Sequence, residues 1–424
     1  MKSFLDNSFL LYSKTAEKLY HEYAANMPIY DYHCHLEAED IAQDRRYDNI
    51  TEVWLGGDHY KWRLMRANGV TEDFITGSAD PLEKFIKWAE TLEITIGNPL
   101  YHWSQMEMRR YFNVTEPLCK KNAKAVYDQC NEIIRSKSFS ARQVIAGSNV
   151  AALCTTDNPI SDLKYHKILK DSDFKTAVRP TFRPELVFNL GMTGWKDYLT
   201  ELGKVTGTTI NNFDELVNAL YARIDYFSSV GCKLSDQCME PPVYVECDKA
   251  TLNSIVQKAL KGEATDATAL NAYRTALMQA LGEKYADAGW AMQLHIAAMR
   301  DNNSRMFAKL GANTGYDSMG DYEIAWPLSR FLDSLDKKDK LPKTIMYSLN
   351  AGSNDILAAM AGNFQGDGVP GKMQFGSAWW FNDHKDGMEA QMRALANVGL
   401  LARFIGMLTD SRSILSYTRH DYFR

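Results

Sequence analysis

The chain has 424 residues, of which 45% are hydrophobic, and 48 basic against 53 acidic residues give a formal net charge of −5. This composition excludes a disordered or low-complexity protein, and the mild charge without long runs of one sign excludes a nucleic-acid partner. Seven cysteines without a Cys-x-x-Cys pair argue against a disulfide scaffold, and the sequence contains no secretory signal and no apolar window long enough for a membrane span, so we expect a cytoplasmic protein.

The N-terminal part of the sequence predicts a helix, a strand and then a long helical region. Ser13 is a typical N-cap, and the helix that follows it ends at Met27-Pro28. Residues 28–33 form a short apolar run that predicts a strand. Residues 58–145 show helical spacing without a convincing strand, including amphipathic helices over 81–92 and 123–134. We interpret 58–145 as a helical insertion.

Beyond about residue 147, short apolar runs alternate with helical stretches. Strands are predicted at 150–154, 175–178, 231–234, 292–296, 344–347 and 404–408, with a weaker one at 372–375. The main helices between them are predicted over 212–229, 249–261, 266–285 and 352–361. Such alternation predicts an α/β fold with a parallel sheet. Together with 28–33 there are eight strands, which favour a distorted (β/α)₈ TIM-type barrel formed by 1–57 and 146–424; an open sheet is the alternative.

Two histidines at the end of the first strand are the first candidate ligands of a metal. His33 and His35 are two residues apart, so their imidazoles point the same way at a strand end and can share one ion. The alternative is a hydrogen-bonded pair in the core. Asp410 follows the last predicted strand, which in a closed ring lies beside the first, and its carboxylate can complete a His₂Asp site. The alternative for Asp410 is an N-cap.

Further polar residues are candidates for contact with a substrate. His59 can bind a hydroxyl and Tyr60 can donate a proton, although Asp58 can equally cap a helix that starts there. Arg412 can tune Asp410 or hold substrate. Arg183 lies between two prolines, and its guanidinium fork suits a carboxylate or phosphate.

Four other candidates lie at or after the ends of predicted strands. Asp236 is expected to follow the strand at 231–234, His295 ends the strand at 292–296, and Arg300 comes five residues later. Trp380 belongs to an aromatic run that can wall a sugar-sized pocket, with core packing as the more frequent reading. Glycine motifs for nucleotides and the Gly-x-Ser-x-Gly elbow are absent from the sequence.

These motifs, in this order, resemble one family. His33-Cys34-His35 and Asp410 are similar to the metal ligands of the amidohydrolase superfamily. Within it, the chain resembles the uronate (glucuronate) isomerase family from about residue 5 to its end, in the segments 58–63 (DHYKWR), 97–103 (GNPLYHW), 155–157 (TTD), 182–184 (FRP), 379–381 (WWF) and 408–413 (LTDSRS).

The resemblance implies an aldose–ketose isomerase of hexuronic acids, acting on D-glucuronate and D-galacturonate. It implies a distorted barrel with a helical insertion and one divalent metal ion, commonly Zn²⁺, held by His33, His35 and Asp410. It further implies that Arg183 grips the substrate carboxylate, that His59, Tyr60 and Arg412 face the reacting end, and that Asp236, His295 and Arg300 occupy other family positions.

Two departures from the family pattern and two alternatives accompany this hypothesis. Asp236 is followed by Gln237, where the family usually has Asp-His, and the family usually continues past Arg424, so the final helix is expected to be short or cut. A mononuclear metal-dependent hydrolase of the same superfamily is one alternative function, and a non-catalytic sugar-acid binder is another. The surface aromatics make a homo-oligomer plausible.

Overall fold

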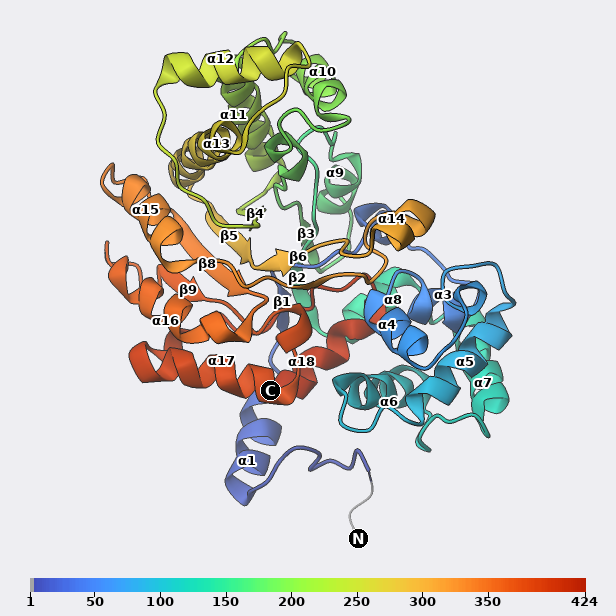
Figure 1. Cartoon of the computed structure of the whole chain (residues 1–424). Coiled ribbons are helices and arrows are strands. Elements are labelled where there is room, and N and C mark those ends of the chain that lie inside the picture. The colour runs from blue at the N-terminus through green and yellow to red at the C-terminus, as the bar shows by residue number, and fades with distance from the viewer. Residues whose placement is uncertain (1–3) are drawn as a thin grey trace.

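Parallel strands form two sheets at the centre of the molecule in the computed structural model, which describes residues 4–424 (Figure 1). The first sheet has the order β1-β2-β3 and the second the order β4-β5-β8-β9, all pairs parallel; β6 and β7 form a separate antiparallel pair. The bounds of the strands are β1 Ile29–Asp31, β2 Val150–Cys154, β3 Ala177–Arg179, β4 Leu234–Met239, β5 Ala291–Ile296, β6 Ala298–Met299, β7 Ser318–Met319, β8 Lys343–Ser348 and β9 Met373–Phe375.

Single backbone contacts connect the two sheets beyond their regular ladders. Phe182, just after β3, forms isolated parallel bridges with Asp157 on one side and Ser235 in β4 on the other. At the opposite edge of the first sheet, the Asp410 N–H donates to the His33 carbonyl at 3.1 Å and the His35 N–H donates to the Ser411 carbonyl at 3.0 Å. The carboxyl ends of β1 and β4 and the segment around residue 410 are therefore brought toward one another.

Two strand predictions differ from the structure. Residues 404–408 are not a strand, because side chains take the place of a ladder: the Tyr32 hydroxyl donates to the Gly406 carbonyl at 2.7 Å, and the Ile405 N–H donates to the Gln374 side chain at 3.1 Å. The strand predicted at 231–234 begins at Leu234, since Gly231, at φ 106°, instead caps the preceding helix. Asp236 consequently lies inside β4 and does not follow it.

Helices cover the sheets on several sides (Figure 1). Their bounds are α1 Lys14–Leu19, α2 Ala38–Ala42, α3 Ile50–Leu55, α4 His59–Ala67, α5 Pro81–Leu92, α6 Pro99–Phe112, α7 Ala123–Arg135, α8 Ala141–Gly147, α9 Lys164–Lys170, α10 Trp195–Thr206, α11 Phe213–Val230, α12 Lys249–Leu260, α13 Ala267–Asp287, α14 Ser304–Leu310, α15 Ala325–Asp336, α16 Asn354–Asn363, α17 Lys385–Val398 and α18 Thr418–Phe423. In Figure 1, α10–α13 lie at one end of the molecule and α3–α8 gather on another side, beside α18. Within residues 4–424, no helix is both long and apolar enough to cross a membrane.

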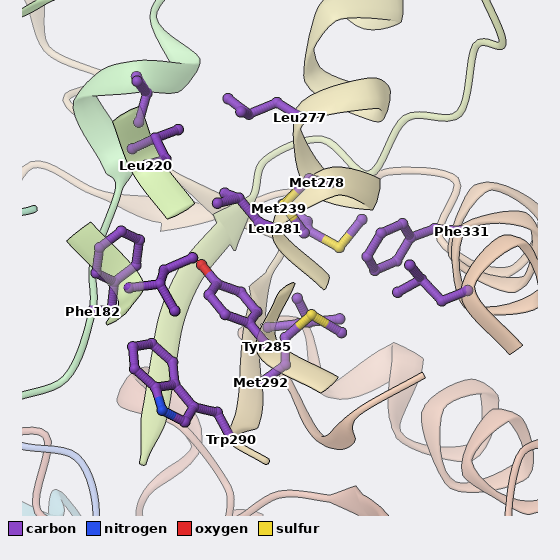
Figure 2. Close-up of a cluster of buried hydrophobic side chains, with 14 of the residues drawn as sticks. Phe182, Leu220, Met239, Leu277, Met278, Leu281, Tyr285, Trp290, Met292 and Phe331 are labelled. Carbon is purple, nitrogen blue, oxygen red and sulfur yellow. The ribbon is translucent and has the colours of Figure 1, made fainter. Parts of the chain in front are cut away.

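Two large hydrophobic clusters stabilise these layers. The first joins α11 and α13 to β4 and β5, and Figure 2 shows Phe182, Tyr285 and Trp290 packed together within it. The second joins the helices of 58–145 to the first sheet, since Trp88 and Phe112 belong to the same cluster as Ile29 in β1. Burial of this much apolar surface is the main stabilising term of such a fold. The helical region therefore packs against β1, the strand that precedes His33 and His35.

Candidate active site

His33, His35 and Asp410 converge at the carboxyl end of β1. The Nε2 atoms of His33 and His35 lie 3.1 and 3.0 Å from the same carboxylate oxygen, Oδ1 of Asp410. The other oxygen, Oδ2, accepts a hydrogen bond from the indole N–H of Trp379 at 2.8 Å. His33 is almost fully buried, whereas His35 and Asp410 are partly accessible from the cavity that they line. The structure thus brings together the three residues that the sequence suggested as a group.

The charges of this group depend on one another. Burial raises the pKa of the Asp410 carboxyl, but the two imidazoles more than offset this effect, and the pKa ends well below its usual range. Burial lowers the pKa of His35 to about 4. For His33 burial also lowers the pKa, but the carboxylates of Asp236 and Asp410 outweigh burial and raise it overall. An ionised carboxylate beside two imidazoles is an electron-rich donor set.

This donor set fits a divalent cation. Zn²⁺ binds imidazole nitrogen and carboxylate oxygen at about 2.0–2.2 Å in a tetrahedron, which separates neighbouring donor atoms by roughly 3.3 Å. The nitrogen–oxygen separations of 3.1 and 3.0 Å in the structure are close to that value. Three protein ligands leave a position open for substrate, as in catalytic rather than structural sites.

Asp236 lies beneath the cavity and connects several of the candidate residues. It is fully buried; its Oδ1 is 2.8 Å from His295 Nδ1, and its Oδ2 is 3.1 Å from Arg183 Nη1 and 3.8 Å from His33 Nδ1. Burial alone would raise the pKa of Asp236, but Arg183, His295 and His33 lower it overall. Asp236 therefore acts as a fixed anion that orients three residues of the cavity. It does not line the cavity itself.

Two arginines line the same cavity, Arg183 from the segment after β3 and Arg300 from the loop after β6. Arg183 Nε is 3.6 Å from Glu185, and its second partner is Asp236. Arg300 donates from Nε and Nη2 to the two carboxylate oxygens of Glu240, at 3.1 and 3.3 Å, and its guanidinium lies 5.6 Å from the ring centre of Trp380. Their carboxylate partners keep both guanidiniums fixed.

His59 and Tyr60 open helix α4, and Asp58 is the N-cap, with its side chain accepting from the Tyr60 and Lys61 N–H groups. His59 lines the cavity together with Arg412 and Trp380, and its ring centre is 5.2 Å from that of Trp380. Burial lowers the pKa of His59. Tyr60 is not among the residues that line the cavity: it stacks on His59, and its hydroxyl is 3.5 Å from Asp383 Oδ2.

Asp383 is a buried carboxyl whose titration can be measured. Burial raises its pKa to about 8, and Arg419 opposes this only in part. Because the pKa is higher in the folded than in the unfolded protein, the stabilising contribution is complete below about pH 4 and is lost as the pH rises toward 8. We expect the free energy of unfolding of Asp383→Asn to rise relative to that of the wild type as the pH increases from 5 to 8. The expected change is about 1.4 kcal/mol, or about 1.5 °C in Tm, for each pH unit.

Thermal unfolding of both proteins at pH 5, 6.5 and 8, with a chelator present, checks this expectation. The measured quantity is the difference between the two Tm values. A difference that stays constant over this range would show that Asp383 is ionised throughout.

Three residues of the site escaped the sequence analysis. Trp379 belongs to the quoted aromatic run, but nothing in the sequence showed that its indole rather than that of Trp380 would contact Asp410. Asn313 lines the cavity from a loop after α14. Arg419 is buried in α18 and contacts the network around Asp383. Asn313 and Arg419 carry no local sequence signal.

Comparison with known proteins identifies the family. A sequence model described as UxaC, Glucuronate isomerase, matches residues 1–424. The chain belongs to the glucuronate isomerase family. Proteins named uronate isomerase from Clostridium acetobutylicum and Caldanaerobacter subterraneus subsp. tengcongensis are 50% and 49% identical to it over 425 residues, which is 100% of this chain and 91% of each relative.

Solved structures agree with this glucuronate isomerase assignment. The crystal structure of uronate isomerase from Thermotoga maritima has a TM-score of 0.94 at 32% identity, covering 100% of this chain and 91% of that chain. Glucuronate isomerase from Caulobacter crescentus has a TM-score of 0.86 at 22% identity, with 93% and 82% covered, and is similar in fold. The resemblance of motifs is therefore confirmed at the level of the family.

Proposed function

We propose that this protein isomerises hexuronic acids, converting D-glucuronate to D-fructuronate and D-galacturonate to D-tagaturonate. The observation that carries the proposal is the convergence of His33, His35 and Asp410 beside Arg183, in a chain that belongs to the glucuronate isomerase family. A substrate of this class needs one group that binds a carboxylate and another that handles a carbonyl and its neighbouring hydroxyl. The hydrolase alternative is not favoured, because the relatives that match the whole length of this chain carry the isomerase name.

The proposed cofactor is one divalent metal ion, with Zn²⁺ as the first choice, held by His33, His35 and Asp410. Their nitrogen and oxygen donors and their spacing of 3.0–3.1 Å support this assignment. When bound, the ion polarises the substrate carbonyl and stabilises negative charge that develops on its oxygen.

The chain's own residues perform the proton transfers in this proposal. Asp410 removes the proton from C2, and the electron pair of that C–H bond forms the C1–C2 double bond of an enediolate. The same proton then adds to C1 while the C2 hydroxyl proton moves to the oxygen on C1, so that C1 becomes a primary alcohol and C2 a ketone. The cavity-lining side chains of His59 and Arg412 hold the oxygens at this end, and Tyr60 supports the His59 imidazole by stacking on it from outside the cavity lining.

Arg183 binds the substrate carboxylate at the other end. Its guanidinium offers a planar fork of donors that matches a carboxylate in two-point fashion. His295, Arg300 and Trp380 complete the wall between the two ends. Asp236 orients Arg183 and His295 from below.

We also propose that the two sheets belong to one distorted (β/α)₈ barrel made of 1–57 and 146–424, with 58–145 as its helical insertion. The bridges at Phe182 and the backbone bonds between His33 and Asp410 support a ring of this kind. A cytoplasmic location is supported by cysteines that all remain unpaired. Light scattering, which measures the mass of the particle in solution, tests the proposed homo-oligomer.

Incubation of the metal-loaded protein with D-glucuronate or D-galacturonate tests the function. We expect ketose signals in the NMR spectrum and, in D₂O, deuterium at the carbon that receives the proton. Treatment with a chelator is expected to abolish turnover, and added Zn²⁺ to restore it. No ketose and no exchange at C2 with either acid would overturn the proposal, and hydrolysis of a lactone or amide without isomerisation would favour the alternative.

A further inference from the structure

The backbone of Asp410 adopts a conformation that needs support. Its φ is 46°, in the left-handed region, which residues other than glycine seldom adopt without support from their surroundings. This conformation aims the carboxylate at His33, His35 and Trp379. Residues 404–410 form no regular strand, so the backbone bonds of Asp410 and Ser411 to the segment after β1 are supplemented by side chains that hold the preceding residue.

The residue before it, Thr409, is held from one side by Asp31 at the end of β1. The Thr409 N–H donates to Asp31 Oδ1 at 2.7 Å, and the Thr409 hydroxyl donates to Asp31 Oδ2 at 2.6 Å. Asp31 is fully buried. Charge-assisted hydrogen bonds in a buried place are strong and directional, so this pair fixes Thr409 against β1.

Arg419 holds Thr409 from the other side. Its Nη1 donates to the Thr409 carbonyl at 3.2 Å, and this carbonyl belongs to the peptide group that leads into Asp410. Arg419 is 1% exposed as a whole residue. Its guanidinium lies 4.3 Å from the ring centre of Trp103 and 5.5 Å from that of Tyr60, and reaches to 3.9 Å from Asp383 Oδ2. Arg419 thus contacts both Thr409, which precedes Asp410, and Asp383, which lies next to the Tyr60 hydroxyl.

We infer that Asp31 and Arg419 are positioning residues, which clamp Thr409 between them and thereby keep the Asp410 carboxylate in the orientation that binds the metal. The inference rests on the proposed function for its catalytic meaning. Its structural content, the link from Arg419 through the Thr409 peptide to Asp410, can be tested without turnover. Loss of a residue that orients a ligand typically weakens metal binding by about 10- to 100-fold.

The test compares Arg419→Met and Arg419→Lys with a matched control, Arg223→Met. Arg223 is also a buried arginine that donates to backbone carbonyls, those of Pro159 and Ser161, but it is not among the residues around the cavity. Zn²⁺ affinity is measured on metal-stripped full-length proteins by competition with a chelating dye, together with Tm. We expect Arg419→Met to raise the Kd for Zn²⁺ about 10- to 100-fold, Arg419→Lys to raise it less, and Arg223→Met to lower Tm without changing Kd.

Different outcomes distinguish a positioning role of Arg419 from a general loss of stability and from a failure of the proposed function. A Kd for Arg419→Met equal to that of the wild type, or equally raised in Arg223→Met, would overturn the clamp. If Arg419→Met does not fold, Arg419→Lys and Asp31→Asn carry the comparison. A wild type that binds Zn²⁺ but does not isomerise uronates refutes the proposed function alone. If the wild type binds no Zn²⁺, crystal structures decide: an unchanged φ of Asp410 in Arg419→Lys overturns the clamp, and a relaxed φ supports it.

Discussion

Replacement of Asp410 by Asn is expected to lower kcat for hexuronate isomerisation by about 10⁴-fold, because one carboxylate serves both the metal and the C2 proton. Asn keeps the size of the side chain and an oxygen for the indole N–H of Trp379. It removes the negative charge that the two imidazoles hold in the ionised state. Saturating Zn²⁺ should restore metal occupancy without restoring turnover, since an amide is not a base near neutral pH.

The measurement that isolates the proton transfer is C2–H exchange in D₂O with the metal site saturated. We expect exchange to be lost together with ketose formation. The control is Asp157→Asn: Asp157 follows β2, is held by Thr155 and the Thr181 N–H, and is not among the residues that line the cavity. It is expected to leave Zn²⁺ affinity unchanged. If Asp410→Asn with bound metal exchanged C2–H at the wild-type rate, another group would be the base.

The grouping of His33, His35 and Asp410 could be predicted from the sequence because it depends on simple geometry. Residues two apart at the end of a strand point the same way. For Asp410 the sequence argument assumed a strand at 404–408 that the structure lacks, and the bond from the Asp410 N–H to the His33 carbonyl places it beside the histidines instead. The same logic placed Arg183 and His295 near the site. At the end of a strand, a short sequence pattern therefore indicates which residues from distant parts of the chain lie close together.

The pattern was less informative where side chains replace backbone pairing. The apolar run at 404–408 reads like a strand, but Tyr32 and Gln374 satisfy its backbone groups in the structure. Gly231 looked like the start of a strand but ends a helix, and this shift put Asp236 inside β4. Hydrophobic runs do not encode such local competition.

The contacts of Trp379, Asp383 and Arg419 could not be predicted at all. Two of these contacts join segments distant in sequence: the partners in the indole–Asp410 bond are 31 residues apart, and those in the Tyr60–Asp383 bond 323 apart, whereas the Arg419–Thr409 bond spans 10 residues. Only the packing of α18 against α6 and the first sheet brings Arg419 to the Thr409 peptide.

Replacement of Arg183 by Met is expected to raise KM for hexuronates by about 100-fold or more, because a charge-assisted, two-point contact with the substrate carboxylate is lost. Arg183→Lys keeps the positive charge beside Asp236 but removes the planar fork, so we expect an intermediate KM. Zn²⁺ affinity should change little in Arg183→Lys. Steady-state kinetics with D-glucuronate and D-galacturonate provide the measurement.

Arg300 is the matched comparison, because it lines the same cavity but is engaged by both oxygens of Glu240 and stacked on Trp380. Its donors are already committed to one carboxylate, so Arg300→Met should raise KM less than Arg183→Met does. The contrast can be sharpened with the corresponding neutral aldohexose, which lacks the carboxylate: the preference of the wild type for the uronate should shrink in Arg183→Met and persist in Arg300→Met. The reverse order would place the substrate carboxylate against Arg300, and the reacting end of the sugar would then have to be assigned anew.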